Sequence, residues 1–258
     1  MDYELELTKT HRLQVARAFR FNKRVDLSID CVIEGQLGKV FVDDLARPTG
    51  YCLTVGSFWY FAGEARSLGG HQLMQRFPAY NILMPSPPAW VDCARELYGD
   101  QLKTFSRHSL SGAHLSADHL TRLLEASPQR ARILPLSLDL ARQVTEKPDN
   151  YLDLSDFDSV ADFSERGVGY VALEQEKVMG VAYSSLVCSY GIEVSIYVDK
   201  AYRRQGVATA LGSQLLLACL QQGLRPNWDA ANPESVKVAE KLGYTYLESY
   251  DAYYHTKK

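Results

Sequence analysis

Short apolar runs separated by turn residues fill the first half of the 258-residue chain. Apolar side chains at helical spacing predict a helix over Thr10–Phe21. β-Branched and aromatic residues predict a strand over Gly38–Asp44 and a long strand over Tyr51–Phe61, joined as a hairpin. The other elements expected here are a helix over Gly70–Phe77, a strand over Asn81–Met84, a helix from Pro87 to Tyr98 and a helix that starts at Ser116 or Asp118 and ends at Glu125.

The second half alternates helices and strands. Its clearest local pattern is the helix Pro233–Leu242, because Asn232 is a favoured N-cap and Gly243 a favoured left-handed C-cap. A helix over Leu134–Thr145 is expected to end at Lys147–Asn150. The remaining predictions are a hairpin of Gly169–Leu173 and Val178–Val187, a strand over Glu193–Val198, a long helix over Gly206–Gln221, a strand over Asn227–Ala230 and a final strand over Tyr244–Tyr254.

The two halves also resemble each other, which suggests a tandem duplication, although chance or shared strand composition would explain so low an identity equally well. If the duplication is real, the first copy has only Arg66–Gly70 where the second has a full glycine-containing turn, so we expect it to have lost ligand binding. The matching segments are Lys39–Val42 with Tyr170–Leu173, Gly50–Thr54 with Gly180–Ser184, and Ala94–Gly99 with Ala239–Tyr244.

Length and turn residues predict two domains, with a boundary after Ser127-Pro128: an N-terminal α/β domain over residues 1–130 and a second domain over 131–258.

The net charge of -3 gives no reason to expect nucleic acid or an acidic membrane as partner. The five cysteines are scattered singly, without the paired spacing of a zinc site or the density of a disulfide scaffold, and are expected to be small core residues. With no signal-like N-terminus and no apolar run of about 18 residues, a cytoplasmic protein is expected. His108, His114 and His119 suit no single helical face, which favours solvated polar positions over a metal site.

The segment Arg203–Ala208 carries the main candidate chemistry. It follows the predicted strand and opens the long helix, whose first turn leaves backbone N–H groups unpaired and favours an anion. Gly206 and Ala208 leave room for a ligand, and the two arginines add charge-assisted donors for phosphate. Glycine spacing alone fits equally well an ordinary helix start flanked by surface arginines.

The pattern Arg203-x-x-Gly206-x-Ala208 resembles the acyl-CoA pyrophosphate motif of the general N-acetyltransferase (GNAT) superfamily. Asn232–Ser235, followed by Ala239–Tyr244, is similar to that superfamily's second motif. The resemblance covers about residues 134–254, and Gly223–Asp229 looks like the branch of zwittermicin-resistance-type acetyltransferases with an N-terminal extension. It implies an α/β (or α+β) fold with a mixed, mostly antiparallel sheet flanked by helices, preceded by an N-terminal domain that is a candidate degenerate copy.

The resemblance implies acetyl-CoA as co-substrate and no metal. Asn232 and Ser235 would contact CoA from the second motif, and a backbone N–H near Ile196 or Tyr197 would polarise the thioester carbonyl. Ile196, Tyr197 and Val198 would pair with the pantetheine arm. The residues implied at the pyrophosphate are Arg203, Arg204, Gln205, Gly206, Val207, Ala208 and Thr209.

Glu193 is the carboxylate best placed to take a proton from an attacking amine, although a solvent-facing strand residue is the alternative because a one-residue register change would reverse its face. Ala239 stands where many members of the superfamily carry a tyrosine acid. Either Tyr244, Tyr246, Tyr197 or Cys188 takes that role, or these side chains simply pack.

The predicted function is transfer of an acetyl group from acetyl-CoA to an amine of a small molecule. A non-catalytic acyl-CoA-binding or regulatory module and a protein or peptide N-acetyltransferase are the alternatives, and a homodimer is left open. The acidic segment from Asp153 to Asp162 is expected to attract a cationic acceptor.

Overall fold

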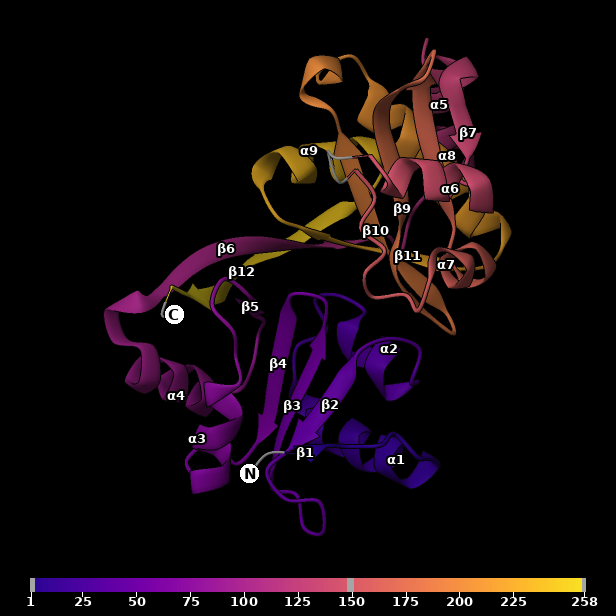
Figure 1. The fold of residues 1–258 in the computed structure, drawn as a ribbon. Helices are drawn as coiled ribbons and strands as arrows, with labels where there is room; N and C mark the ends of the chain where they lie inside the picture. Colours follow the sequence, from indigo (N-terminus) through magenta and orange to yellow (C-terminus); the bar gives the residue numbers. More distant parts are fainter. Residues whose placement is uncertain (1–2, 148–150, 257–258) are drawn as a thin grey trace. The chain divides into compact units, whose positions relative to one another are not determined.

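The computed structural model describes residues 3–147 and 151–256, which form two compact units. The N-terminal unit comprises residues 3–107 together with 249–256, and the C-terminal unit comprises residues 108–248. Each unit is a sheet with helices packed against it (Figure 1).

In the N-terminal unit the strands lie in the order β1-β2-β3-β4-β5-β12. Neighbouring strands are antiparallel except for the parallel pair β4–β5. Helices α1 and α2 lie on one side of this sheet and α3 and α4 on the other (Figure 1). The elements are β1 (Tyr3–Glu4), α1 (Lys9–Ala18), α2 (Ser28–Ile33), β2 (Lys39–Val42), β3 (Gly50–Val55), β4 (Phe58–Gly63), α3 (Leu68–Gln75), β5 (Ile82–Leu83) and α4 (Pro88–Tyr98).

In the C-terminal unit the strand order is β7-β8-β9-β10-β11-β6. Here β10–β11 is the parallel pair, and the other neighbours are antiparallel. The remaining elements of the chain are β6 (Leu102–Ser111), α5 (Ala117–Glu125), β7 (Ile133–Pro135), α6 (Leu138–Thr145), α7 (Val160–Arg166), β8 (Gly169–Glu174), β9 (Lys177–Cys188), β10 (Gly191–Val198), α8 (Val207–Gln221), β11 (Arg225–Ala230), α9 (Pro233–Leu242) and β12 (Thr245–His255). Residues 102–107 of β6 and 249–255 of β12 belong to the N-terminal unit.

The two units repeat one order of elements. The series β1-α1-α2-β2-β3-β4-α3-β5-α4-β6 recurs as β7-α6-α7-β8-β9-β10-α8-β11-α9-β12. The last strand of each series joins the other unit: residues 108–110 of β6 pair with β11, and Tyr253 of β12 pairs with Leu83 of β5. The internal repeat expected from the sequence is therefore present in the topology.

This exchange makes the compact units differ from the ranges expected from the sequence, 1–130 and 131–258. Residues 108–130 lie in the C-terminal unit and residues 249–256 in the N-terminal one. The physical reason is strand pairing over more than 100 residues, such as Trp228 with Leu110. Turn residues such as Ser127-Pro128 carry no information on a partner so far away in the chain.

Several predicted elements need correction. The run Tyr51–Phe61 is two strands, β3 and β4, because Gly56 takes a left-handed backbone (φ 53°) and turns the chain. The polar stretch before α5 contains the strand β6, which pairs with β11. Helix α6 begins only at Leu138, after its N-cap Ser137, and α7 was not predicted. The predicted helix end at Lys147–Asn150 includes residues 148–150, which lie outside the described residues.

The core of the C-terminal unit forms where α8 packs across strands β8 to β11. Gly212 makes this close approach possible, because a Cβ there would lie 2.6 Å from Leu242 and 3.2 Å from Ile196. Tyr197, the next residue in β10, packs instead against Tyr151 with ring centroids 5.2 Å apart. Since neighbouring strand residues point to opposite faces, α8 covers the Ile196 face and residues around Tyr151 cover the other.

All five cysteines are buried free thiols, which confirms the expectation that they are small core residues. Burial raises the pKa of Cys93 to about 11 and that of Cys219 to about 12, so neither is a thiolate at neutral pH. Among the described residues, none forms a helix of sufficient length and apolar character to cross a membrane.

Candidate functional site

The strands β10 and β11 separate part-way along their length. Their parallel register runs from Gly191↔Arg225 to Glu193↔Asn227 and ends there. β10 nevertheless stays paired with β9 as far as Val198, with a register irregularity at Glu193/Val194. The residues of β10 beyond Glu193, including Ile196, Tyr197 and Val198, therefore run along one side of an opening between the two strands.

Glu193 lies at the start of this opening and is only 5% exposed, so the solvent-facing alternative is wrong. Its Oε2 accepts a hydrogen bond from Asn227 Nδ2 at 2.8 Å. Its Oε1 accepts one from the backbone N–H of Asp229 at 2.9 Å. Both carboxylate oxygens are thus held by donors from β11.

The connection from β10 to α8 is a tightly bonded loop. Arg203 Nε donates to the carbonyl of Val198 at 3.2 Å, which turns the chain back at the end of the strand. Gln205 Nε2 donates to the carbonyl of Ala201 at 2.9 Å. From the segment after α5, the nearly buried Gln129 donates to the carbonyl of Gln205 at 3.3 Å. These contacts fix the loop from both sides.

Gly206 opens α8 in a left-handed conformation, with φ 81°. Apart from Gly206 itself and its neighbours along the chain, no heavy atom of the described residues lies within 4 Å of the position that a Cβ on Gly206 would occupy. Arg203, Arg204 and Gln205 are exposed, whereas Val207 points inward and is buried. The first turn of α8, which includes Ala208 and Thr209, therefore begins beside open space with two cationic side chains next to it.

The second predicted group, Asn232 and Ser235, forms the start of α9. Asn232 accepts a hydrogen bond from the backbone N–H of Ser235 at 2.9 Å, as predicted for an N-cap. The Ser235 hydroxyl accepts one from Trp228 Nε1 at 3.0 Å. Both side chains thus have structural hydrogen bonds, and their contact with a cofactor stays a prediction.

Tyr244 is the buried phenol near this site. Its hydroxyl donates to the carbonyl of Pro226 at 3.0 Å, and its ring packs edge-on against Trp228. Burial, and then the nearby Cys219 and Glu193, raise its pKa well above the ordinary value, so the phenol holds its proton at neutral pH. Ala239 is fully buried in α9.

His108, His114 and His119 have different surroundings. His119 Nε2 bonds the carbonyl of Lys241 at 2.9 Å, and the His108 ring lies 6.0 Å from that of Tyr246. His114 is exposed. Within residues 3–147 and 151–256, no group of three or more His, Cys, Asp or Glu side chains is arranged to hold a metal ion.

The corresponding helix start in the N-terminal unit, that of α3, has a different environment. Ser67 caps it by accepting a hydrogen bond from the N–H of Gly70 at 2.9 Å. The carboxylate of Asp43 lies against Gly69, since a Cβ there would be 3.0 Å from Asp43 Oδ2. A negative side chain therefore already lies beside the first turn of α3.

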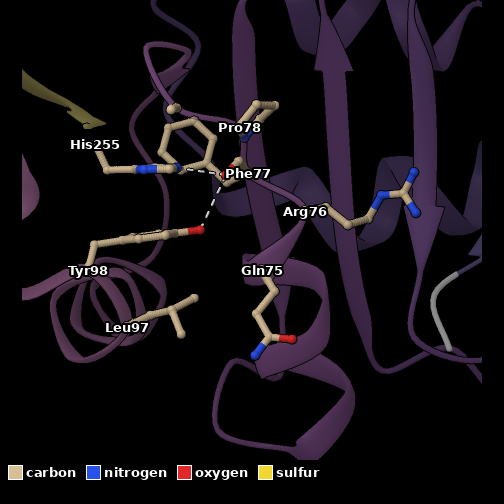
Figure 2. A pocket seen from close by; sticks show the side chains of 8 residues that line it. Gln75, Arg76, Phe77, Pro78, Leu97, Tyr98 and His255 are labelled. Carbon is tan, nitrogen blue, oxygen red and sulfur yellow. Dashed lines mark hydrogen bonds between the residues drawn. The ribbon is translucent and has the colours of Figure 1, made fainter. Parts of the chain in front are cut away.

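The N-terminal unit contains a separate pocket of about 360 Å³ next to the end of α3 (Figure 2). Tyr98 and His255 are stacked on its wall, with ring centroids 3.9 Å apart. His255 Nε2 donates to the carbonyl of Phe77 at 2.8 Å, and the Tyr98 hydroxyl donates to the carbonyl of Met74 at 2.7 Å. These contacts tie α4 to the last turn of α3 and β12 to the chain just after it, which is a packing role.

Comparison with known proteins identifies the family. The GNAT acetyltransferase profile matches residues 19–253, which is most of the chain and includes both units. The chain belongs to the GNAT acetyltransferase family. It is 22% identical over 227 residues to the uncharacterized N-acetyltransferase YdfB of Bacillus subtilis strain 168, covering 84% of this chain and 85% of that protein.

Solved structures agree with this assignment. A GCN5-related N-acetyltransferase-like protein from Streptococcus suis 89/1591 superposes with a TM-score of 0.83 at 29% identity, covering 96% of this chain and 99% of that one. A tandem GNAT protein from the clavulanic acid biosynthesis pathway has a TM-score of 0.58 at 11% identity over 100% of this chain and 99% of its own. This second likeness shows that the repeated fold occurs in another GNAT protein.

The sequence did not point to two residues that contact the candidate site, Asn227 and Gln129. Asn227 was only the first residue of a predicted strand, and its contact with Glu193 spans 34 residues. Gln129 contacts Gln205 across 76 residues. Neither contact leaves a local pattern, because both depend on strand register and loop packing rather than on neighbouring residues.

Proposed function

We propose that the protein transfers an acetyl group from acetyl-CoA to an amine of a small molecule. The observation that carries the proposal is the combination, within one unit, of an open helix start with two arginines and a strand opening that begins at a buried carboxylate. Membership of the GNAT family makes acetyl-CoA the expected co-substrate.

The residues present fit a CoA pyrophosphate. The exposed α8 start offers unpaired backbone N–H groups, Gly206 leaves the approach clear, and the cations balance the charge. The groups proposed here are the backbone amides of Gln205, Gly206, Val207, Ala208 and Thr209 with the side chains of Arg203 and Arg204.

When bound, acetyl-CoA supplies an activated acyl group as a thioester. The side of β10 from Ile196 to Val198 is proposed to hold the pantetheine arm, because its backbone is released from the β11 ladder. A backbone N–H near Ile196 or Tyr197 is proposed to stabilise negative charge on the carbonyl oxygen during attack. Asn232 and Ser235 complete the proposed cofactor site at α9.

Glu193 is the proposed proton acceptor. An amine attacks only in its neutral form, so a carboxylate beside the opening accelerates the reaction by taking the proton, directly or through water. The two hydrogen bonds from β11 stabilise the ionised form of Glu193, which is the form that accepts a proton, and thereby oppose the effect of its burial.

The acceptor is proposed to be a cationic amine. Asp153 and Asp156 lie close enough to the Tyr183 hydroxyl to contribute to its raised pKa, together with burial as the main cause. Tyr183 pairs with Ser195 of β10, two residues beyond Glu193. Because this proximity places them near β10, Asp153 and Asp156 are the carboxylates of this segment that we assign to attracting the acceptor.

Thiol release from acetyl-CoA with a panel of polyamines, aminoglycosides and amino acids tests the proposal. We expect turnover with polycationic amines above that with amino acids, and a loss of about 100-fold or more in kcat for Glu193→Gln. Thiol release that is equal in wild type and Glu193→Gln would rule out the assigned role of Glu193.

A non-catalytic acyl-CoA-binding module is the second candidate, favoured by the buried Ala239 at the usual tyrosine position. It predicts that acetyl-CoA raises the Tm while no amine in the panel releases thiol. The two candidates thus separate on the same protein sample.

A further inference from the structure

The backbone of β11 donates to a side chain at the point where its ladder with β10 ends. The N–H of Arg225 donates to the carbonyl of Tyr190 at 2.8 Å, so this amide faces β10. Strand amides alternate in direction, so that of Asp229 faces β10 as well. It donates at 2.9 Å to Glu193 Oε1. A carboxylate oxygen therefore takes the place of a backbone acceptor at the first step beyond the ladder.

Asn227 supplies the other donor. It lies directly opposite Glu193 in the parallel register, so the two side chains project from the same face of the sheet. Its Nδ2 donates to Glu193 Oε2 at 2.8 Å, within the range of a charge-assisted hydrogen bond. One backbone and one side-chain donor thus hold the two oxygens, and only the side-chain donor depends on residue type.

Other groups near Glu193 come from β9, from β11 and from the residues between α9 and β12. The Ser185 hydroxyl of β9 donates to the main-chain carbonyl of Glu193 at 3.4 Å. The acceptor in this hydrogen bond is the main chain and not the carboxylate. Tyr244, whose hydroxyl donates to Pro226, is close enough for the charge of Glu193 to raise its pKa. Asp229 is an acidic residue of β11, two positions after Asn227. Because the Glu193 side chain is buried, an amide donor has a marked effect on its ionised carboxylate.

We propose that Asn227 is a positioning residue, which holds the Glu193 carboxylate at the head of the opening between β10 and β11 and favours its ionised form. This inference rests on the proposed function, in which Glu193 accepts the proton of the amine. Loss of the Asn227 donor leaves Oε2 with weaker solvation in a buried place. The carboxylate then takes up a proton more readily and loses its fixed direction.

The kinetic test compares Asn227→Ala with Asn227→Gln and Ser185→Ala. Asn227→Ala is expected to lower kcat by about tenfold, leave KM for acetyl-CoA within about twofold and move the acidic limb of the kcat/KM profile to higher pH. Asn227→Gln keeps an amide donor and is expected to recover most of kcat. Ser185→Ala removes the contact with the Glu193 main chain and is expected to keep the wild-type profile. If the pH profile of kcat/KM in Asn227→Ala equals that of wild type while Glu193→Gln is inactive, the inference on Asn227 is overturned and the proposed function stands.

A second measurement needs no acceptor. In protein labelled with ¹³C at glutamate carboxyls, the Glu193 signal is assigned by its loss in Glu193→Gln and followed through a pH titration. We expect its midpoint to lie at higher pH in Asn227→Ala than in wild type and Ser185→Ala, with unchanged circular dichroism as the check on folding. Equal midpoints overturn the inference. Failure of every amine to release thiol from wild type overturns the proposed function instead, and this titration still decides the role of Asn227.

Discussion

At the scale of single residues, the hydrogen bond from Gln129 to Gln205 is one that the local sequence does not predict. It is 7% exposed and donates to the carbonyl of Gln205, just before the glycine that opens α8. Holding that carbonyl fixes the peptide that leads into Gly206 and therefore the direction of the amides that follow. A side chain far from the loop in sequence thus helps to fix the conformation of the loop.

We expect Gln129→Met, which keeps the side-chain length and loses the donor, to raise the Kd for CoA by about two- to tenfold. The Kd for pantetheine, which lacks the pyrophosphate, is expected to stay unchanged. Isothermal titration calorimetry measures both. Gln14→Met is the matched control, because the Gln14 amide donates to the Tyr51 hydroxyl in the N-terminal unit. Equal Kd values for CoA in wild type and Gln129→Met would contradict the assigned role of Gln129.

At the scale of elements, predictability follows how local the determining contacts are. Helix α9 was predicted to the residue, because Asn232 caps it and Gly243 ends it at φ 104°, both within the helix's own sequence. Strand β6 was missed because its polar residues do not alternate clearly with apolar ones. Its strand conformation depends instead on pairing with β11. The candidate site divides similarly: the Arg203–Ala208 turn is local, whereas the partners of Glu193 require the register of β10 and β11.

The start of α3 allows an element-scale prediction on pH. Burial raises the pKa of Asp43, but hydrogen bonds from Thr49 and Gly50 outweigh it and bring the pKa below its ordinary value. A depressed folded-state pKa stabilises the fold above the unfolded pKa of about 3.9, and this contribution is lost as the pH falls through the folded value. We expect Asp43→Ala to lower the free energy of unfolding by about 1 kcal/mol at pH 7, with the difference from wild type vanishing in acid.

Urea unfolding at several pH values measures this difference. Asp92→Ala is the matched control, because Asp92 forms an exposed ion pair with Arg95 and is expected to change stability little at any pH. A destabilisation by Asp43→Ala that is as large at pH 2.5 as at pH 7 would show that lost packing, and not the ionised carboxylate, explains the effect.

At the scale of the whole molecule, the chain contains one GNAT topology twice, with the last strand of each series exchanged. The repeat was visible in short strand segments such as Lys39–Val42 and Tyr170–Leu173, because similar positions in a sheet select similar side chains. The exchange was not visible, because Tyr253 pairs with Leu83 across 170 residues of chain and no local pattern specifies so distant a partner. Sequence therefore predicted the kind of unit better than its boundaries.

The two helix starts lead to a prediction on stoichiometry. α8 begins at Gly206 beside open space and two exposed arginines, whereas α3 begins beside Asp43 and is capped by Ser67. An anion approaching α3 meets a carboxylate at the place where α8 offers cations, so repulsion opposes binding there. We expect one acetyl-CoA per chain by isothermal titration calorimetry, and no detectable binding after Arg203 and Arg204 are both replaced by glutamate. Two equivalents per chain, or one that persists in this double variant, would place acetyl-CoA in the N-terminal unit.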